Sequence, residues 1–429
     1  MKKIKIISSA VLCMVSVSVM AQSGTNSPYS QYGLGILSSQ AQGFNRGMDG
    51  LALGLRYGNQ VNSLNPASYS AIDSLTMIFD VGLSGQITNF KENGASINAK
   101  NACFEYAVAA FRVLPRMGVS IGILPYSNIG YSYSNTTRVG TSETTATEAY
   151  SGSGGIHQAY VGFGWNVFSG LSVGANISYL WGSYDKEISI TSSDSYVNTM
   201  SRTYSATVSN YKLDFGLQWD HKLNKTDWLT LGATVGIGHS LGADPESTTS
   251  SSNTQTGVSA DTTLYVTNGL SIPMSYGGGV SWRHSDKLVL GFDYTLQKWG
   301  DVDIPETDAK TGEYVLTKGL LRDRQKFTFG GEWTPNSMSL NFFSRIHYRF
   351  GASYATPYIS VHGADGPKEY SVSAGFGIPI INRYNDHSFL NISGQWVRSE
   401  SNSFITENTF RINLGITFNE RWFMKWKVK

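Results

Sequence analysis

The sequence predicts an all-β protein, a 14-stranded antiparallel transmembrane β-barrel with an N-terminal hatch, or plug, segment inside the lumen. Three observations predict it: segments of alternating apolar and polar residues, an even number of such segments, and an export signal in front of them. In one segment Tyr370, Val372 and Phe376 share one face, and Ser371 and Ser373 the other. Because hydrocarbon offers no hydrogen bonds, such strands cross a membrane only in a closed barrel.

The first 21 residues have the features of a signal peptide. Lys2 and Lys3 precede an apolar run over residues 6–19, and Ala21 ends a small-residue cleavage site. The run is too short for a membrane-spanning helix. Leu12 stands where a lipoprotein site would place a small residue before Cys13, so lipidation is not expected. We therefore expect a protein exported to the bacterial outer membrane.

Composition narrows the class further. Charged residues make up 15% of the chain, and its 24 tyrosines, 20 phenylalanines and 10 tryptophans suit aromatic belts at membrane interfaces. The net charge of +2 gives no argument for a nucleic-acid partner. Once the signal is removed, Cys103 is the only cysteine, so no internal disulfide is expected.

Fourteen strands are predicted along the chain, and the links between them differ in length. Short links fall near Leu114-Pro115, Phe168-Ser169, His284-Ser285 and Thr334-Pro335, as expected of periplasmic turns. Long links near 135–156, 188–202, 241–262, 300–322 and 356–368 are expected to be outer loops; their Ser- and Thr-rich parts, such as residues 246–257, carry little apolar material. The predicted strands are 75–84, 102–113, 116–134, 157–167, 170–187, 203–220, 228–240, 263–282, 287–299, 323–334, 339–355, 369–381, 388–399 and 404–418.

A soluble β-sandwich is the competing fold, and the polarity of the inner face disfavours it. A sandwich core would need a partner for every buried charge, whereas a lumen tolerates charged and amide side chains. The residues that point opposite to the apolar face of their strands include Lys212, Asp214, Asp293, Glu332, Asn391, Arg411 and Asn413.

Between the signal and the first strand lies a glycine-rich segment without clean alternation. It is too long for a tail and too short for a separate domain, and a barrel lumen would cover its apolar residues. The predicted division of the chain is therefore a signal peptide over residues 1–21, a hatch over 22–73 and the barrel over 74–429.

This segment resembles that of the FadL/TodX hydrophobic-compound transporters. The resemblance rests on the triplet Asn65-Pro66-Ala67 shortly before strand one, the preceding run Gly43-Phe-Asn-Arg-Gly47-Met-Asp-Gly50, and the strand count. The start Asn26-Ser-Pro-Tyr-Ser-Gln-Tyr-Gly33 is similar to Bacteroidetes-type members. The resemblance implies passive uptake of long-chain fatty acids or similar hydrophobic molecules, with release sideways through a defect in strand three.

Strand three contains a proline at its centre. Its outward face is predicted to carry Met117, Val119, Ile121, Ile123 and Pro125, and then Ser127, Ile129, Tyr131 and Tyr133. Proline gives no N–H to the ladder, so Pro125 marks a local break. A lateral opening is expected at Gly122, Pro125, Asn128 and Gly130, abutted from inside by a hatch gate of Asn65, Pro66 and Ala67. A bulge that only helps to close the barrel is the alternative.

The resemblance implies a ligand pocket made by the hatch. Candidate lining residues are Tyr29, Tyr32, Phe44, Arg46, Leu51, Leu55 and Arg56, and simple plug packing is the favoured alternative for the five that are not arginine. Arg46 or Arg56 can pair with a substrate carboxylate, or with a lumen carboxylate such as Glu332. The expected partners are a hydrophobic small molecule and the lipid and lipopolysaccharide of the outer membrane, and the expected state is a monomer.

Alternatives from other classes remain open. FadL-like barrels include a PorV-like branch that assists protein secretion by binding cargo, and a purely adhesive surface barrel is a third possibility. No catalytic or phosphate-binding motif is present, and the seven histidines lack metal-ligand spacing. His157 and His239, which precedes Ser240, are where a hidden barrel hydrolase would first be sought. The sequence therefore predicts no enzyme, no cofactor and no metal site.

Overall fold

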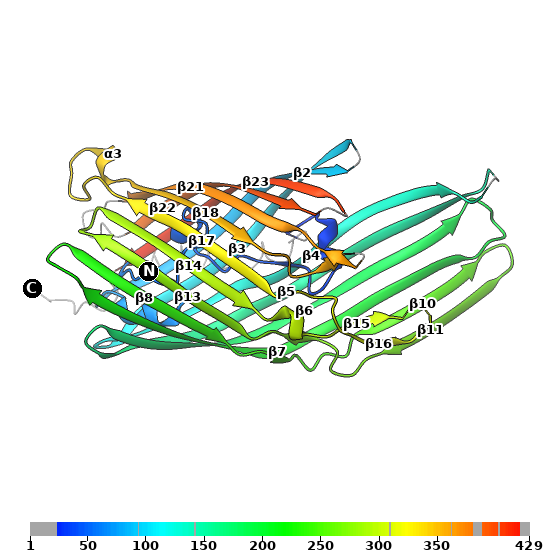
Figure 1. Cartoon of the computed structure of the whole chain (residues 1–429), viewed down its shortest axis with the longest axis horizontal. Coiled ribbons are helices and arrows are strands. Elements are labelled where there is room, and N and C mark those ends of the chain that lie inside the picture. Colours follow the sequence, from blue (N-terminus) through cyan, green and yellow to red (C-terminus); the bar gives the residue numbers. More distant parts are fainter. Residues whose placement is uncertain are drawn as a thin grey trace, which may run out of the picture.

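The computed structural model describes residues 24–420, except 93, 141–142, 309, 362, 381–387 and 402–403. The predicted signal peptide and residues 421–429 lie outside the described part. The fold is a closed antiparallel barrel of fourteen strands (Figure 1), which confirms the predicted fold class. Its wall strands are β2 (Met77–Glu92), β3 (Ala95–Leu114), β4 (Met117–Arg138), β5 (Thr145–Phe168), β6 (Leu171–Ser192), β7 (Thr199–Lys222), β8 (Asp227–Gly236), β13 (Ser275–His284), β14 (Leu288–Gln297), β17 (Arg324–Trp333), β18 (His347–Ala355), β21 (Lys368–Ile380), β22 (Ser388–Glu400) and β23 (Thr406–Glu420).

The first and last wall strands close the barrel. They pair from Met77 opposite Glu420 to Lys91 opposite Thr406. Side chains alternate as predicted: on β21 Val372 is 52% exposed, whereas Ser373 on the other face is 2% exposed. No helix in the described part of the chain is both long and apolar enough to cross a membrane. The apolar exterior and polar interior are those of a barrel that sits in lipid.

Part of the wall is much taller than predicted. The expected loops at 135–156 and 188–202 are largely strand, because β4 and β5 pair as far as Arg138 and Thr145, and β6 and β7 continue to Ser192 and Thr199. The stretch 246–257, also expected to be loop, forms β10 (Glu246–Asn253), which pairs with β7 and with β11 (Val258–Tyr265). Figure 1 shows this side of the barrel extending beyond the rest. Ser and Thr fill both faces of these strands, so the apolar alternation that marks a membrane strand is missing.

The remaining outer connections carry short elements. They are β9 (His239–Ser240) with β12 (Ser271–Ile272), η3 (Trp299–Asp301), β15 (Ile304–Thr307) with β16 (Tyr314–Thr317), and β19 (Ser360–Val361) with β20 (Ala364–Asp365). Two predicted strand starts are therefore wrong: the strand expected from residue 263 begins at Ser275, and the one expected from 339 begins at His347.

At the opposite end, where β2 begins and β23 ends, most turns are short. The connections there are residues 115–116, 169–170, 223–226 and 285–287. The tight turn expected at Thr334-Pro335 is wrong, because residues 334–346 form a longer turn that contains α3 (Phe342–Arg345). The Asn341 side chain accepts a hydrogen bond from the Phe343 N–H, which caps this helical turn and delays the start of β18.

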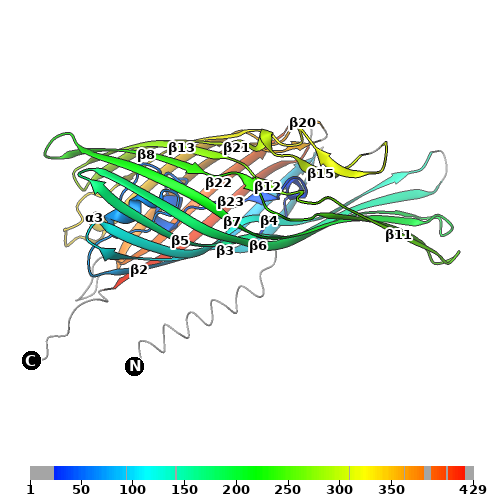
Figure 2. The same cartoon turned by 90° about the horizontal axis from the view of Figure 1, so that it is seen from below.

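The N-terminal segment runs through the barrel interior (Figures 1 and 2). Its elements are η1 (Pro28–Gln31), β1 (Ile36–Leu37), α2 (Gly43–Arg46) and η2 (Pro66–Ala71). Inward-facing wall residues hold it by its backbone. Asp293 Oδ2 accepts from the N–H groups of Ala52 and Leu53 at 2.6 and 2.8 Å, and the Gln218 amide donates to the carbonyls of Leu53 and Leu55. The polar lumen predicted from sequence is thus the surface on which this segment docks.

Candidate functional site

The barrel wall is unpaired along the outer half of the β3–β4 seam. Pairing of β3 with β4 stops at Ala107 opposite Ile123, although both strands continue. Over the outer stretch β3 pairs only with β2, as far as Ala95, and β4 pairs with β5, as far as Arg138. Two strand edges therefore face each other without a ladder between them.

Pro125 lies two residues beyond the point where the seam opens. It begins a bulge in the pairing of β4 with β5, where the register shifts between Pro125 and Ser127 and Tyr126 is left over. The bulge reverses the side-chain parity, so Ile129 and Tyr131 are buried inside the barrel. The predicted outward direction of these two residues is wrong, since an extra residue moves each later side chain to the other face.

Two glycines on the neighbouring strands accommodate this bulge. Gly155 of β5 has φ +149°, and a Cβ there would collide with the Ser127 carbonyl oxygen. Gly182 of β6 has φ +152°, and a Cβ there would collide with the Gly155 carbonyl oxygen. L-residues with side chains rarely adopt such backbone angles. The distortion therefore extends across three strands at the height of the opening.

Residues 30–40, here called the strap, replace β3 along the free edge of β4. Ile36 and Leu37 form antiparallel pairs with Asn128 and Ser127. The Ser38 N–H donates to the Tyr126 carbonyl at 2.9 Å.

The strap also satisfies the backbone groups on either side of this short ladder. The Gln40 amide donates to the Pro125 carbonyl at 2.8 Å. The Ser30 hydroxyl accepts from the Gly130 N–H at 3.1 Å and donates to the carbonyl of the same residue at 3.3 Å. Since buried backbone groups need partners, the strap seals the opening from inside.

The β3 edge is covered by the first described residues. The Gly24 carbonyl accepts from the Cys103 thiol at 3.1 Å and from the Gln86 amide at 3.4 Å. The Asn26 amide donates to the Asn101 side chain at 3.0 Å. A Cβ at Gly24 would lie 3.3 Å from both Cys103 Sγ and Asn128 Cγ, so this residue sits between the β3 and β4 edges.

The triplet Asn65-Pro66-Ala67 occupies a different part of the wall from the one expected. It begins η2, and the Asn65 amide donates to the carbonyls of Leu53 and Leu217 at 2.9 and 3.3 Å. A Cβ on Gly174 of β6 would collide with Pro66. The triplet thus packs on glycines of β6 and β7, and the residue that contacts Pro125 is Gln40 of the strap.

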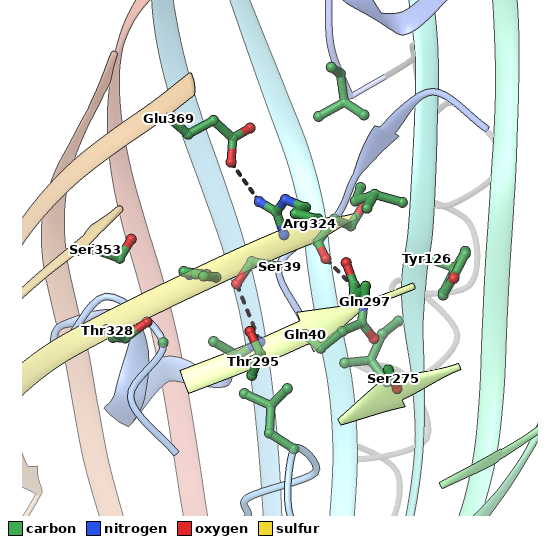
Figure 3. Close-up of a pocket in the computed structure, with 18 of the residues that line it drawn as sticks. Ser39, Gln40, Tyr126, Ser275, Thr295, Gln297, Arg324, Thr328, Ser353 and Glu369 are labelled. Carbon is green, nitrogen blue, oxygen red and sulfur yellow. Dashed lines mark hydrogen bonds and ion pairs between the residues drawn. The ribbon is translucent and has the colours of Figure 1, made fainter. Parts of the chain in front are cut away.

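A cavity of about 400 Å³ lies behind the strap in the lumen. Its lining includes Gln40, Tyr126 and polar side chains of β13, β14, β17, β18 and β21 (Figure 3). Arg324 and Glu369 form an ion pair of 2.6 Å across this surface. The labelled lining residues are Ser39, Gln40, Tyr126, Ser275, Thr295, Gln297, Arg324, Thr328, Ser353 and Glu369. Apolar side chains such as Leu37, Leu124 and Ile272 also line the cavity, so it suits a molecule with both hydrogen-bonding and apolar parts.

The structure divides the predicted pocket residues into two groups. Tyr29 and Arg46 line the lumen cavity, whereas Leu55 and Arg56 line a second cavity of about 210 Å³. The others are packing residues: Phe44 and Leu51 lie in a small apolar cluster, and Tyr32 packs against Phe404 in a larger one.

The side chains of Arg46 and Arg56 bind other side chains of the barrel and the hatch. Arg46 Nη2 lies 2.8 Å from Glu105 Oε2, and both side chains are less than 10% exposed. The Arg56 guanidinium donates to the hydroxyls of Ser70 and Ser172. Burial lowers the pKa of Arg56, and the nearby Asp220 carboxylate opposes this shift. Glu332, the lumen carboxylate considered from sequence, pairs instead with Arg349 at 2.6 Å.

The histidines considered from sequence and the acidic side chains of the lumen lie apart from one another. Within residues 24–420, apart from the undescribed positions, no group of three or more His, Cys, Asp or Glu is arranged to hold a metal ion. His157 stacks obliquely on Trp181, and His239 on Tyr211, so each has an aromatic packing role.

The sequence did not predict the strap, nor the role of Gly155 and Gly182 in accommodating the bulge. The strap contributes only a two-residue strand, too short to show alternation. The doublet Gly154-Gly155 inside a predicted loop was the available signal, since glycine within a strand often marks a bulge.

Comparison with known proteins supports the fold. A family model described as BamG matches residues 1–429. No curated protein sequence matches. Solved structures that match include the Pseudomonas putida toluene transporter TodX, with 16% identity, a TM-score of 0.61, and coverage of 91% of this chain and 100% of that one. The Ralstonia pickettii toluene transporter TbuX has 14% identity, a TM-score of 0.60 and coverage of 88% and 98%. A Pseudomonas aeruginosa FadL homologue has 13% identity, a TM-score of 0.59 and coverage of 89% and 99%. The FadL-like fold implied by the sequence resemblance is confirmed.

Proposed function

The chain belongs to the BamG family, and from the geometry of its wall we propose that it is an outer-membrane channel that passes hydrophobic or amphipathic molecules sideways through the β3–β4 seam. The observation that carries this proposal is the unpaired outer half of that seam, closed from inside by a strap instead of by a strand ladder. A wall that served only as a scaffold would gain stability by completing the ladder. The seam is therefore built as a lateral gate in the barrel wall.

The strap is held on the β4 edge by few contacts, and Lys186 and Tyr358 hold its other side through the carbonyls of Gln31, Gly33 and Gly35. Its contacts with the β4 edge are a two-residue ladder and a few side-chain hydrogen bonds. Each such bond contributes roughly 0.5–1.5 kcal/mol net, so the whole set contributes a few kcal/mol. An opening that breaks only these β4-edge contacts, while the Lys186 and Tyr358 contacts stay in place, therefore costs a few kcal/mol, and a ligand that binds the open state better shifts the population toward it.

The cavity and the seam together suggest the kind of cargo. Hydroxyl, amide and paired charged groups line part of the cavity, and the outward face beside the seam carries Ile121 and Ile123, both more than 40% exposed. A molecule with a polar head and an apolar tail, such as a long-chain fatty acid, places its head in the cavity and its tail toward lipid. Burial of the tail gains about 25 cal/mol per Å² of apolar surface. The toluene transporters and the FadL homologue share the fold and support a hydrophobic cargo.

A second candidate is a PorV-like role in protein secretion, in which the barrel binds a cargo segment. One observation favours it: what pairs with the β4 edge in this structure is itself an extended peptide, Ile36–Leu37. A peptide strand from a cargo protein would use the same backbone groups.

Native mass spectrometry with lipid extraction, on protein purified from its own membrane in mild detergent, separates the two. Channel function predicts a stoichiometric fatty acid or other hydrophobe, lost when residues 24–40 are deleted. A matched deletion in the β10–β11 tip, residues 254–257, should leave the ligand in place. Co-purified secreted protein with no small ligand would transfer support to the secretion role, and a wild-type barrel without either would contradict both.

A further inference from the structure

The turn between β17 and β18 exposes large apolar side chains at the periplasmic end of the barrel. Leu340 is 101% exposed, Met338 93% and Phe343 67%. Ten consecutive residues, 335–344, carry no charge. Soluble surfaces rarely gather such side chains without a function.

The other four described turns at this end are short, and three of them carry a cationic residue, whereas residues 169–170 are Ser-Gly. Residues 115–116, 223–226 and 285–287 are short and contain Arg116, Lys225 and Lys287. They need only reverse the chain. The thirteen residues 334–346 do more than this, because two or three would connect β17 to β18.

The base of this turn is fixed to the outward aromatic belt of the wall. The Tyr348 hydroxyl donates to the Phe343 carbonyl at 3.1 Å. The Tyr348 ring lies 5.5 Å from that of Trp333 and 5.7 Å from that of Phe376, centroid to centroid. Trp333 and Phe376 are about half exposed on the lipid-facing side. The apolar turn is therefore continuous with the surface that faces lipid.

We propose that residues 334–346 form a membrane foot, which lies in the headgroup region of the inner, phospholipid leaflet with Met338, Leu340 and Phe343 among the acyl chains. The continuity with the aromatic belt and the absence of charge favour lipid over a protein partner as the occupant. Arg345 ends the uncharged run. Interfacial segments of this kind bury apolar side chains roughly 5–10 Å deep.

The mature chain allows a clean test because Cys103 is its only cysteine once the predicted signal is removed. In a Cys103→Ser background, Leu340→Cys is labelled with an environment-sensitive fluorophore and reconstituted into vesicles of phosphatidylethanolamine and phosphatidylglycerol. Met338→Cys provides a second reporter in case one variant folds poorly. Asn224→Cys, in the polar turn between β7 and β8, is the matched control.

If residues 334–346 lie in the membrane, the fluorophore emission is blue-shifted at positions 338 and 340 but not at 224. Lipids that carry a nitroxide near the headgroup end of the chain then quench this emission more strongly than lipids that carry it at the tail end. Water-like emission at both positions, with quenching no greater than at 224, would overturn the proposal and leave the turn free to bind a periplasmic protein.

Discussion

Arg46 is expected to be the main electrostatic anchor between the N-terminal segment and the wall. Its guanidinium pairs with Glu105 of β3 at 2.8 Å and donates to the carbonyls of Ala41 and Ser39 at 2.9 and 3.3 Å. It thus links α2, the strap and the strand that borders the seam. Arg46→Met would leave Glu105 as a buried carboxylate without its cation, which costs about 3–5 kcal/mol.

Native-state hydrogen exchange measures this cost locally. The Gly50 N–H, bonded to the Asn45 carbonyl at 2.8 Å, reports on opening of the segment around α2. A loss of about 3–5 kcal/mol corresponds to exchange that is faster by between roughly one hundred and a few thousand fold. The Ile237 N–H, bonded to the Leu213 carbonyl, should be unchanged.

A double-mutant cycle separates the ion pair from the other Arg46 contacts. Glu105→Gln keeps an acceptor for the Ser84 hydroxyl and removes the charge. If the pair anchors the segment, Arg46→Met with Glu105→Gln recovers part of the loss, and the coupling energy is about 1–3 kcal/mol. Purely additive effects, with coupling below about 0.5 kcal/mol, would refute the reasoning.

Three further predictions concern the seam. Gln40→Ala removes the hydrogen bond to the Pro125 carbonyl, so release of the strap should be about fivefold more frequent (about 1 kcal/mol), seen as faster hydrogen exchange of the Ser38 N–H, which is bonded to the Tyr126 carbonyl; an unchanged rate would contradict this. Gly155→Ala should destabilise the barrel by roughly 1–3 kcal/mol in urea unfolding, whereas Gly85→Ala, where a Cβ meets nothing within 4 Å, should have a much smaller effect; equal effects would argue against a role of Gly155 in accommodating the bulge. Pro125→Ala restores a backbone N–H to β4 and should slow fatty-acid uptake. Deletion of residues 24–38 removes most of the strap and should make uptake faster and ungated. Unchanged uptake in both variants would rule out the seam as the route.

The sequence was sufficient for the barrel because alternation is a local signal. Each lipid-facing residue, such as Val372 or Phe376, reports its own environment, and the strand count then follows. The tall outer strands were missed because their Thr and Ser side chains face polar surroundings on both sides. Thr136 and Thr147 stabilise that region by a cross-strand hydrogen bond of 3.0 Å, which leaves no periodic apolar pattern.

The candidate site was predicted only in part. Pro125 indicated the position of the opening because the missing N–H belongs to that residue alone and is visible in the sequence. The register shift at Tyr126, and hence the inward turn of Ile129 and Tyr131, depends on pairing with β5 and is invisible in one strand. The strap was missed for the same reason, since Ile36 and Leu37 become a strand only by contact with residues more than eighty positions away.

Locking the strap to β4 tests the central claim most directly. Ile36 lies opposite Asn128, and Leu37 lies opposite Ser127. Adjacent antiparallel pairs alternate between a wider and a closer Cα spacing, so one of the two pairs should have the spacing that a disulfide needs. Both double variants, Ile36→Cys/Asn128→Cys and Leu37→Cys/Ser127→Cys, are therefore made in a Cys103→Ser background. Thr248→Cys/Thr263→Cys, across the β10–β11 hairpin, is the control cross-link. The account predicts that the oxidised strap lock reduces uptake of a labelled fatty acid to the level of cells without the barrel, that reduction restores it, and that the control cross-link has no effect. Uptake at the full rate through the oxidised lock would show that cargo does not pass the β3–β4 seam.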